Sequence, residues 1–302
     1  MEHQVIILGG GPAGISALLW CHSLGLQAIL LEQGKELGGQ MLQMFHPVLE
    51  YPGFPDKTGV ELRDEFERHL RTYNLRYRVN CHLEEINLRD RRLLVNGEML
   101  SAQAFIIATG AQNRRLGLAN EETLPGISYS ATHDQQKFAG QEVVVVGGGD
   151  SAFEDSLILA EVCPRVMLLH RSDKFRARPS WQQAVFTHPR IQVMTNCEIK
   201  EASSLADNQL QLLVVNRTTA RQQTMQAHGL FVRLGIAPNT AFLQQQITVD
   251  VAGFVVVDRA QKTSLPNVYA VGDVCRPVCF SVATAIGHGA IAAKDIAEML
   301  RP

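Results

Sequence analysis

The sequence predicts an α/β fold of two Rossmann-like, three-layer dinucleotide-binding domains, the second inserted in the first. Three observations predict it. A strand, a glycine turn, a helix and a strand open the chain, the same pattern begins again at residue 142, and segments rich in breaker residues lie at 114–117 and 235–239. A repeated βαβ unit indicates two parallel sheets, one for each domain.

The first unit starts with an apolar run rich in β-branched residues at 4–8, which predicts a buried strand. A glycine turn follows at 9–14, a helical stretch at 15–24 and a second apolar strand at 28–31. Together these segments form a βαβ unit.

The second unit repeats this order. A strand is expected at 142–146, a turn at 147–149, a helix at 152–161 and a strand at 166–169. This unit predicts a second nucleotide-binding half.

The breaker segments mark the two crossings between the domains. We therefore expect a discontinuous first domain, 1–114 with 238–302, and an inserted second nucleotide-binding domain, 115–237.

Composition excludes several classes of protein. The 302 residues are 46% hydrophobic with a net charge of −2, and the basic residues form no stripe of the kind that binds nucleic acid. The N-terminus has no signal-peptide pattern, and the most apolar window, 15–31, is too interrupted to span a membrane. We expect a cytoplasmic protein, with a peripheral link to a membrane left open. Its six cysteines are too few for a disulfide framework, and no metal site is expected.

The first glycine turn has the spacing Gly9-x-Gly11-x-x-Gly14 between a strand and a helix. The first glycine permits the tight turn, the second lets a pyrophosphate approach the backbone, and the third lets helix and strand pack closely. Glu32 ends the second strand, where a carboxylate takes the adenosine ribose hydroxyls. The alternative is a plain turn whose glycines serve packing alone.

Eight peptides identify a family. GGGPAG (9–14), GGQM (38–41), YPGFP (51–55), ATG (108–110), GGGDSA (147–152), HRSDKFRA (170–177), GIAPNT (235–240) and VYAVGDV (268–274) occur in the order seen in low-molecular-weight thioredoxin reductases, which the chain resembles over almost its whole length. This resemblance implies FAD at the first turn. It therefore implies that 1–114 with 238–302 is the FAD-binding domain and that 115–237 is of the NADPH type and is a candidate to hold a second FAD. The FAD-binding residues it implies are Gly9, Gly11, Pro12, Ala13, Gly14, Glu32, Gln33, Gly39, Gln40, Thr109, Gly110, Gly272, Asp273, Ser281 and Val282.

The chain departs from that family at the redox-active CATCD. The matching residues are Ser130-Ala131-Thr132-His133-Asp134, so the ordinary disulfide cannot form there. His133 is read as a leftover polar residue, with a proton carrier as the alternative.

A different pair, Cys275 and Cys279, follows the Gly272-Asp273 pair, in a segment that the family places beside the flavin. If this stretch is helical, residues four apart share one face, with Cα atoms about 6 Å apart, which a disulfide can span. A helix N-terminus would also lower the pKa of a thiol. We expect a redox-active pair; the alternative is two small buried hydrophobic residues.

The second nucleotide site keeps its glycines and loses a cation. In NADPH-using relatives a His-Arg-Arg peptide holds the 2′-phosphate, and here it reads His170-Arg171-Ser172. Arg176 and Arg178 remain nearby. The candidate residues of this site are Gly147, Gly149, Asp150, Ser151, His170, Arg171 and Arg176. Weakened NADPH binding or a vestigial domain are both possible.

These departures resemble the diflavin-linked disulfide oxidoreductases of photosynthetic bacteria. The resemblance implies two FAD per chain, with NADPH in the second site as the alternative, and electron flow from a dithiol to flavin. We expect a flavin-dependent disulfide oxidoreductase that exchanges electrons with a small thiol/disulfide partner, as a homodimer. The alternatives are an NAD(P)H-dependent ferredoxin or flavodoxin reductase and a non-enzymatic flavin-binding redox sensor.

Overall fold

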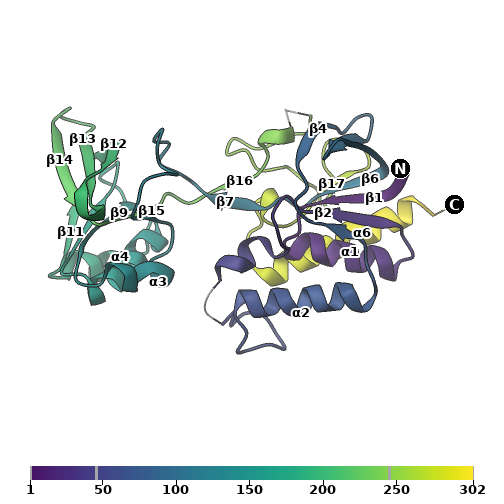
Figure 1. Ribbon diagram of the computed structural model, residues 1–302, viewed down its shortest axis with the longest axis horizontal. Helices are drawn as coiled ribbons and strands as arrows, with labels where there is room; N and C mark the ends of the chain where they lie inside the picture. Colours follow the sequence, from purple (N-terminus) through teal and green to yellow (C-terminus); the bar gives the residue numbers. More distant parts are fainter. Residues whose placement is uncertain (1, 45–46, 244–245, 302) are drawn as a thin grey trace. The chain divides into compact units, whose positions relative to one another are not determined.

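The computed structural model describes residues 2–44, 47–243 and 246–301. It divides into two compact units (Figure 1). Unit 1 comprises Met1–Gln112 and Ala237–Pro302, and unit 2 comprises Asn113–Ile236. The divisions fall beside the breaker segments 114–117 and 235–239. The two connecting segments pair with each other as the strands β7 (Ala111–Asn113) and β16 (Ile236–Pro238).

Unit 1 is built on a mainly parallel sheet of order β3-β2-β1-β6-β5-β4, with β17 paired to β6. Its strands are β1 Glu2–Leu8, β2 Ala28–Leu31, β3 Tyr77–Arg78, β4 Leu83–Asn87, β5 Arg92–Val95, β6 Glu98–Ile107 and β17 Val268–Ala270. The predicted strand at 28–31 is confirmed. Strand β1 lies at the centre between β2 and β6, and its Val5, Ile6 and Ile7 are fully buried because helices and further chain cover both faces.

One face of this sheet carries the helices α1 (Pro12–Ser23), α2 (Gly59–Thr72) and α6 (Val282–Met299) (Figure 1). Helix α1 begins at Pro12, earlier than the apolar pattern predicted, because proline suits the first helical turn, where its missing N–H has no partner to lose. Helices α1 and α6 approach so closely that a Cβ at Gly289 would lie 2.4 Å from the carbonyl oxygen of Ala13.

Unit 2 contains a parallel sheet of order β11-β10-β9-β15-β8 and an antiparallel sheet β12-β13-β14. Its strands are β8 Ile127–Ser128, β9 Glu142–Gly147, β10 Arg165–Leu169, β11 Ile191–Met194, β12 Cys197–Ser204, β13 Leu210–Asn216, β14 Gln222–Ala227 and β15 Gly229–Arg233. Its helices are α3 Ala131–Asp134, α4 Asp150–Val162 and α5 Pro179–Thr187. Two apolar clusters, one shared with the helices and one with the antiparallel sheet, cover the two faces of the parallel sheet, which makes three layers.

The described helices include none that is long and apolar enough to cross a membrane. Within the same ranges, no group of three His, Cys, Asp or Glu side chains is arranged to hold a metal ion.

Candidate functional site

The first glycine turn joins β1 to α1 at the edge where the parallel strands of unit 1 end, which we call the carboxyl edge. Gly9 has φ +110°, and a Cβ there would lie 2.4 Å from the carbonyl oxygen of Ala108. A Cβ at Gly14 would lie 1.9 Å from the carbonyl oxygen of Gly9. Only glycine fits at both positions, because the turn, β6 and α1 leave no space for a side chain.

Gly11 differs from these two glycines because the space where its Cβ would stand is open. It is the N-cap of α1 and offers no side-chain cap. The first N–H groups of the helix, which have no intrahelical acceptor, and the positive end of its dipole therefore remain available to an anion. Gly39, with φ +54°, borders the same space, since its Cβ would lie 3.2 Å from the Cα of Gly11.

Glu32 follows β2 and is held at the turn by backbone donors. The N–H of Gly10 donates to Oε2 at 2.5 Å, and the N–H of Gly34 donates to Oε1 at 2.6 Å. The carboxylate is thus fixed in one orientation beside the turn, whereas the neighbouring Gln33 is exposed.

The 3-10 helix η5 (Gly272–Cys275) brings a second carboxylate to this edge. The Gln40 amide donates to Oδ2 of Asp273 at 2.6 Å. Burial raises the pKa of Asp273, while Gln40 and His288 oppose the rise. The N–H of Gly272 donates to Nδ1 of His288 at 3.3 Å. His288 was missed from the sequence because no motif contains it; its place on α6 is the only signal.

The remaining candidate residues of unit 1 lie just after the C-terminal end of β6 and at the start of α6. Thr109 exchanges two hydrogen bonds with Asn239, through Oγ1 to the Asn239 carbonyl at 2.9 Å and from Nδ2 of Asn239 to its own carbonyl at 2.8 Å. Gly110 accepts from the N–H of Asn239 at 3.0 Å. Ser281 is the N-cap of α6 and accepts from the N–H of Thr284 at 3.1 Å, and Val282 is buried.

The second glycine turn, between β9 and α4, repeats this geometry in unit 2. A Cβ at Gly147 would lie 2.4 Å from the carbonyl oxygen of Arg233, whereas the space at Gly149 is open. Gly149 is the N-cap of α4 without a side-chain cap. Asp150 and the exposed Ser151 follow it. Asp150 is paired with Arg178, with Nε 2.8 Å from Oδ2, so its charge is partly balanced.

The cations of this second site are few. The His170 ring packs under the turn, because a Cβ at Gly148 would lie 2.2 Å from the ring, and it contacts Phe175 at 5.0 Å between ring centroids. Burial lowers the pKa of His170. Arg171 and Arg176 are exposed, and the Arg176 N–H donates to the Gly148 carbonyl at 2.8 Å.

The segment 130–134 is held by polar contacts. Ser128 Oγ donates to Oδ2 of Asp134 at 2.7 Å, and His133 Nδ1 lies 2.7 Å from Oδ1 of the same carboxylate. His133 is therefore paired with its neighbour in sequence, a contact that no sequence pattern predicts. The Ala131 N–H donates to Oδ2 of the buried Asp155 at 3.1 Å.

Asp155 also lies against Arg233, with Nε 3.2 Å from Oδ2, and Arg233 donates to the carbonyl of Tyr129. Burial raises the pKa of Asp155 to about 6, although Arg233 and the Ala131 N–H oppose the rise. Arg233 and Asp155 lie far apart in the sequence, so neither could be placed here from it.

The pKa of Asp155 predicts how the stability of unit 2 depends on pH. The unfolded pKa is about 3.9, so the folded state binds more protons between about pH 4 and about pH 6. The free energy of unfolding should fall by about 3 kcal/mol as the pH rises through this window, and level off above it, because one pKa unit is about 1.4 kcal/mol. Asp155→Asn should remove this contribution, so that its slope differs from that of wild type across the window.

The measurement uses urea unfolding of Trp20→Phe protein, in which Trp181 is the remaining tryptophan and packs against the core of unit 2. The exposed Asp173, changed to Asn, is the matched control and should keep the wild-type slope. Equal slopes in wild type and Asp155→Asn would contradict the assignment.

The cysteine pair differs from the sequence expectation. Cys275 ends η5, and Arg276 with φ +52° stops the helix, so Cys275 and Cys279 do not share a helical face. The prediction of a common helix is wrong because Pro277 and a left-handed residue separate them. All six cysteines are free thiols, with Cys279 exposed and Cys275 partly buried.

The expected lowering of a thiol pKa is also wrong for Cys275. Burial and the charge of Asp273 raise its pKa to about 12. It lies at the end of η5, six residues before the N-cap of α6, Ser281, and so is not itself at a helix N-terminus. Cys21 and Cys163 are fully buried in the two cores, as expected of structural cysteines.

Two strand–turn–helix cradles on two three-layer units define a paired Rossmann-like, dinucleotide-binding protein. The profile of the family described as pyridine nucleotide-disulphide oxidoreductase matches residues 3–289. The chain belongs to this family, and it is a thioredoxin reductase-like member of it.

The chain is similar to these proteins over nearly its full length. A thioredoxin reductase of Listeria innocua is 34% identical over 297 residues, covering 97% of this chain and 92% of the relative. A thioredoxin reductase structure from Lactococcus lactis (FR conformation) has a TM-score of 0.80 at 30% identity and covers 98% of both chains. One from T. acidophilum has a TM-score of 0.76 at 27% identity, covering 99% of this chain and 98% of its own. The predicted fold class is thereby confirmed.

Proposed function

We propose that this protein is an FAD-dependent thiol/disulfide oxidoreductase in which Cys275 and Cys279 exchange electrons between a partner dithiol and flavin. One observation carries the proposal. Cys275 lies two residues beyond Asp273 in η5, so the only close cysteine pair of the chain is attached to the carboxyl edge of unit 1. A pair in this position belongs to the same unit as the first glycine turn.

The residues of unit 1 fit FAD. The open space at Gly11 and the uncapped start of α1 suit a pyrophosphate. The oriented carboxylate of Glu32 suits ribose hydroxyls, and the Gln40–Asp273 pair suits the ribityl-phosphate part. Gly39, Thr109, Gly110, Ser281 and Val282 line the same edge and complete the proposed contacts. When bound, FAD supplies two-electron transfer to or from a disulfide.

The two thiols have different proposed roles because one is exposed and the other is partly buried. Cys279, being exposed, is the sulfur that an outside thiol can reach, and Cys275, being partly buried beside Asp273, is the sulfur nearer the flavin-type site. Because Asp273 and burial raise the pKa of Cys275, this sulfur takes a proton when the disulfide is opened, and the proton stays on it at neutral pH. His288 orients the Gly272 turn by accepting from its N–H.

For the second site we propose a second FAD, with NADPH as the alternative occupant. The open cradle at Gly149 suits a pyrophosphate of either. Ser172 stands where relatives carry an arginine, and Arg178 is engaged with Asp150, which leaves Arg171 and Arg176 as the exposed cations for a 2′-phosphate. This weak cationic set favours a ligand without a 2′-phosphate. The resemblance to diflavin-linked oxidoreductases, together with a homodimeric, cytoplasmic state, belongs to the same proposal.

A second candidate is an NAD(P)H-dependent ferredoxin or flavodoxin reductase. The free thiols of Cys275 and Cys279 favour it, since a reductase of that kind needs no disulfide. The two candidates differ in the source of electrons.

The proposal predicts about two FAD released per denatured chain, measured by absorbance after removal of protein, because each unit offers one dinucleotide cradle. Dithiothreitol without oxygen should bleach the flavin, whereas NADPH should bleach it slowly. A content near one FAD per chain, with rapid bleaching by NADPH, would overturn the two-FAD proposal, and a Cys275→Ser protein that bleaches like wild type would then favour the ferredoxin-reductase candidate.

A further inference from the structure

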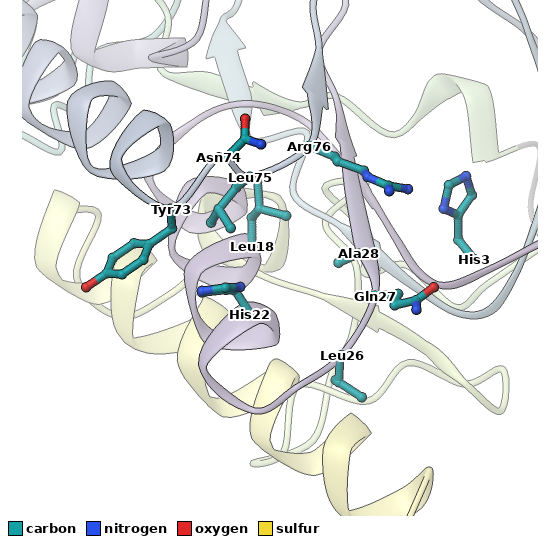
Figure 2. Close-up of a pocket in the computed structure, with 10 residues that line it drawn as sticks. All are labelled: His3, Leu18, His22, Leu26, Gln27, Ala28, Tyr73, Asn74, Leu75 and Arg76. Carbon is teal, nitrogen blue, oxygen red and sulfur yellow. The ribbon is translucent and has the colours of Figure 1, made fainter.

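Unit 1 contains a cavity at the edge of its sheet opposite to the carboxyl edge. Strands β1, β2 and β3 run parallel, and the cavity is lined by the start of β1 and by the segments that lead into β2 and β3 (Figure 2). We call it the amino-edge pocket; residue 3 and residues of the segments 18–28 and 73–76 line it. A strand rises about 3.3 Å per residue, so His3 lies about 20 Å from Gly9. The pocket is therefore separate from the first glycine turn.

One side of the pocket carries a positive charge that no carboxylate balances. Figure 2 shows the guanidinium of Arg76 extending toward the ring of His3, with the side chain of Gln27 on the same side. None of the ten lining residues is acidic. Within the described ranges Arg76 forms no ion pair, whereas Arg78 is paired with Glu98 at 2.6 Å. The guanidinium of Arg76 is thus available to an oxyanion, which it can bind through two parallel N–H groups.

His3 supplies a second polar group to this side. Its side chain is buried, and its Nε2 has no hydrogen-bond partner in the part of the chain that the structure describes. Buried polar atoms in folded proteins nearly always have a partner, so this nitrogen indicates a partner from outside the chain. Burial and then positive charges, Arg76 and Arg78 among them, lower the pKa of His3, while Glu98 opposes the change. A neutral imidazole in these surroundings offers one N–H to an anion.

The other side of the pocket is mainly apolar. Leu18 belongs to the core of unit 1, and the partly buried Leu26 and Leu75 pack against that core. Tyr73 lies against His22, with 5.3 Å between the ring centroids. The cavity has a volume of about 220 Å³. Sites for drug-sized ligands hold roughly 300–1,000 Å³, so the occupant of this cavity is a smaller molecule.

We propose that the amino-edge pocket binds a small organic anion, with one carboxylate or phosphate group between Arg76 and His3 and an apolar body over Leu26 and Leu75. The single unpaired cation matches a single oxyanion group, and the partly buried leucines gain apolar burial when the body covers them. This inference does not rest on the proposed function, because no residue of the pocket belongs to a glycine turn or to the cysteine pair.

The test uses benzoate as the probe and the flavin-loaded protein with isotope-labelled histidine. Benzoate should shift the NMR ring signals of His3, assigned by their loss in His3→Gln, and should raise the pKa of His3, because a bound anion favours the charged imidazolium. Calorimetry should show that Arg76→Gln weakens benzoate binding about tenfold or more, since a hydrogen bond to a charged group is worth that much.

Arg89→Gln is the matched control for the loss of a cation. Arg89 is exposed like Arg76, and it also forms no ion pair within the described part of the chain. It lies in the turn between β4 and β5, outside the pocket. This variant should bind benzoate with the wild-type affinity.

Three further probes define the ligand. Benzyl alcohol, which lacks the charge, and acetate, which lacks the ring, should each bind about tenfold more weakly than benzoate, because each loses one of the two kinds of contact. The tighter binder of benzoate and phenyl phosphate identifies the preferred oxyanion, and either preference supports the proposal. Equal affinities for benzoate and benzyl alcohol would contradict it, since the charge would then not be recognised.

Three other results overturn the proposal. The first is an unchanged His3 signal in the presence of benzoate, or equal benzoate affinity in wild type and Arg76→Gln. The second is release of FAD by benzoate, because the anion would then occupy a glycine turn. The third is a change of oligomeric state in Arg76→Gln, measured by sedimentation, which would assign Arg76 to a contact between two copies of the chain.

Discussion

Gly14→Ala should abolish FAD binding and destabilise unit 1. The new Cβ would lie 1.9 Å from the carbonyl oxygen of Gly9 and 3.4 Å from the Cβ of Ala108, and the first of these neighbours is backbone that cannot rotate away. Relief of the overlap requires α1 to move from β1. We expect a cost of about 3 kcal/mol or more, which corresponds to at least about a hundredfold in any equilibrium that depends on the turn.

Gly11→Ala tests the contact with the cofactor without changing the packing of the turn. Its Cβ would meet nothing within 4 Å, and φ −74° with ψ −179° is open to alanine. The stability of the apoprotein should change by less than about 1 kcal/mol, whereas FAD retention should fall, because the methyl group occupies the space into which a pyrophosphate approaches.

The two measurements are thermal unfolding of the apoprotein and FAD content after reconstitution. If the proposed FAD site is correct, Gly14→Ala lowers both the thermal stability of the apoprotein and the FAD content, whereas Gly11→Ala lowers only the FAD content. Full FAD content in Gly11→Ala would show that the glycines of the first turn serve packing alone.

Cys275→Ser should eliminate reduction of the flavin by dithiols. A serine hydroxyl cannot form or open a disulfide, so the path from Cys279 to flavin is cut. We expect the anaerobic rate with dithiothreitol to fall at least about a hundredfold, since removal of a group that carries a covalent step usually costs that much. FAD content should stay at the wild-type value, which shows that the effect lies in the transfer step.

Cys163→Ser is the control for loss of a thiol. Cys163 is fully buried in the core of unit 2, and its thiol donates to the carbonyl of Phe138 at 3.4 Å, a bond that serine can keep. Its dithiol rate should match wild type. If instead Cys275→Ser retained the wild-type rate with dithiothreitol, the pair would have no part in electron transfer, and rapid bleaching by NADPH would then support the ferredoxin-reductase candidate.

Much of the fold could be predicted from the sequence because its signals are local. The strand at 28–31 is predicted by its apolar run. The start of the nucleotide turn is predicted by Gly9, whose backbone conformation other residues rarely adopt. The helix across Cys275–Cys279 could not be excluded in this way. Spacing of four is compatible with a helix, and only the left-handed Arg276 shows that the chain turns there.

The polar contacts of the candidate sites could not be predicted from sequence patterns. Asp155 receives Ala131 N–H and faces Arg233, and Gly272 N–H donates to His288. Each of these pairs joins residues from different elements, so their proximity depends on how those elements pack. The same is true of the raised pKa of Cys275, which results from burial and from Asp273 rather than from its position along the chain.

By itself, the sequence determined that two glycine turns follow two buried strands, because the turn requires glycine at fixed spacing and a parallel strand requires apolar residues on both faces. It also determined that the close pair of cysteines lies at 275 and 279 and that 130–134 contains no cysteine. Only the tertiary structure decided that Cys279 is exposed while Cys275 is partly buried against a carboxylate. Exposure and electrostatic environment are produced by contacts between distant segments, and those contacts exist only once the chain has folded.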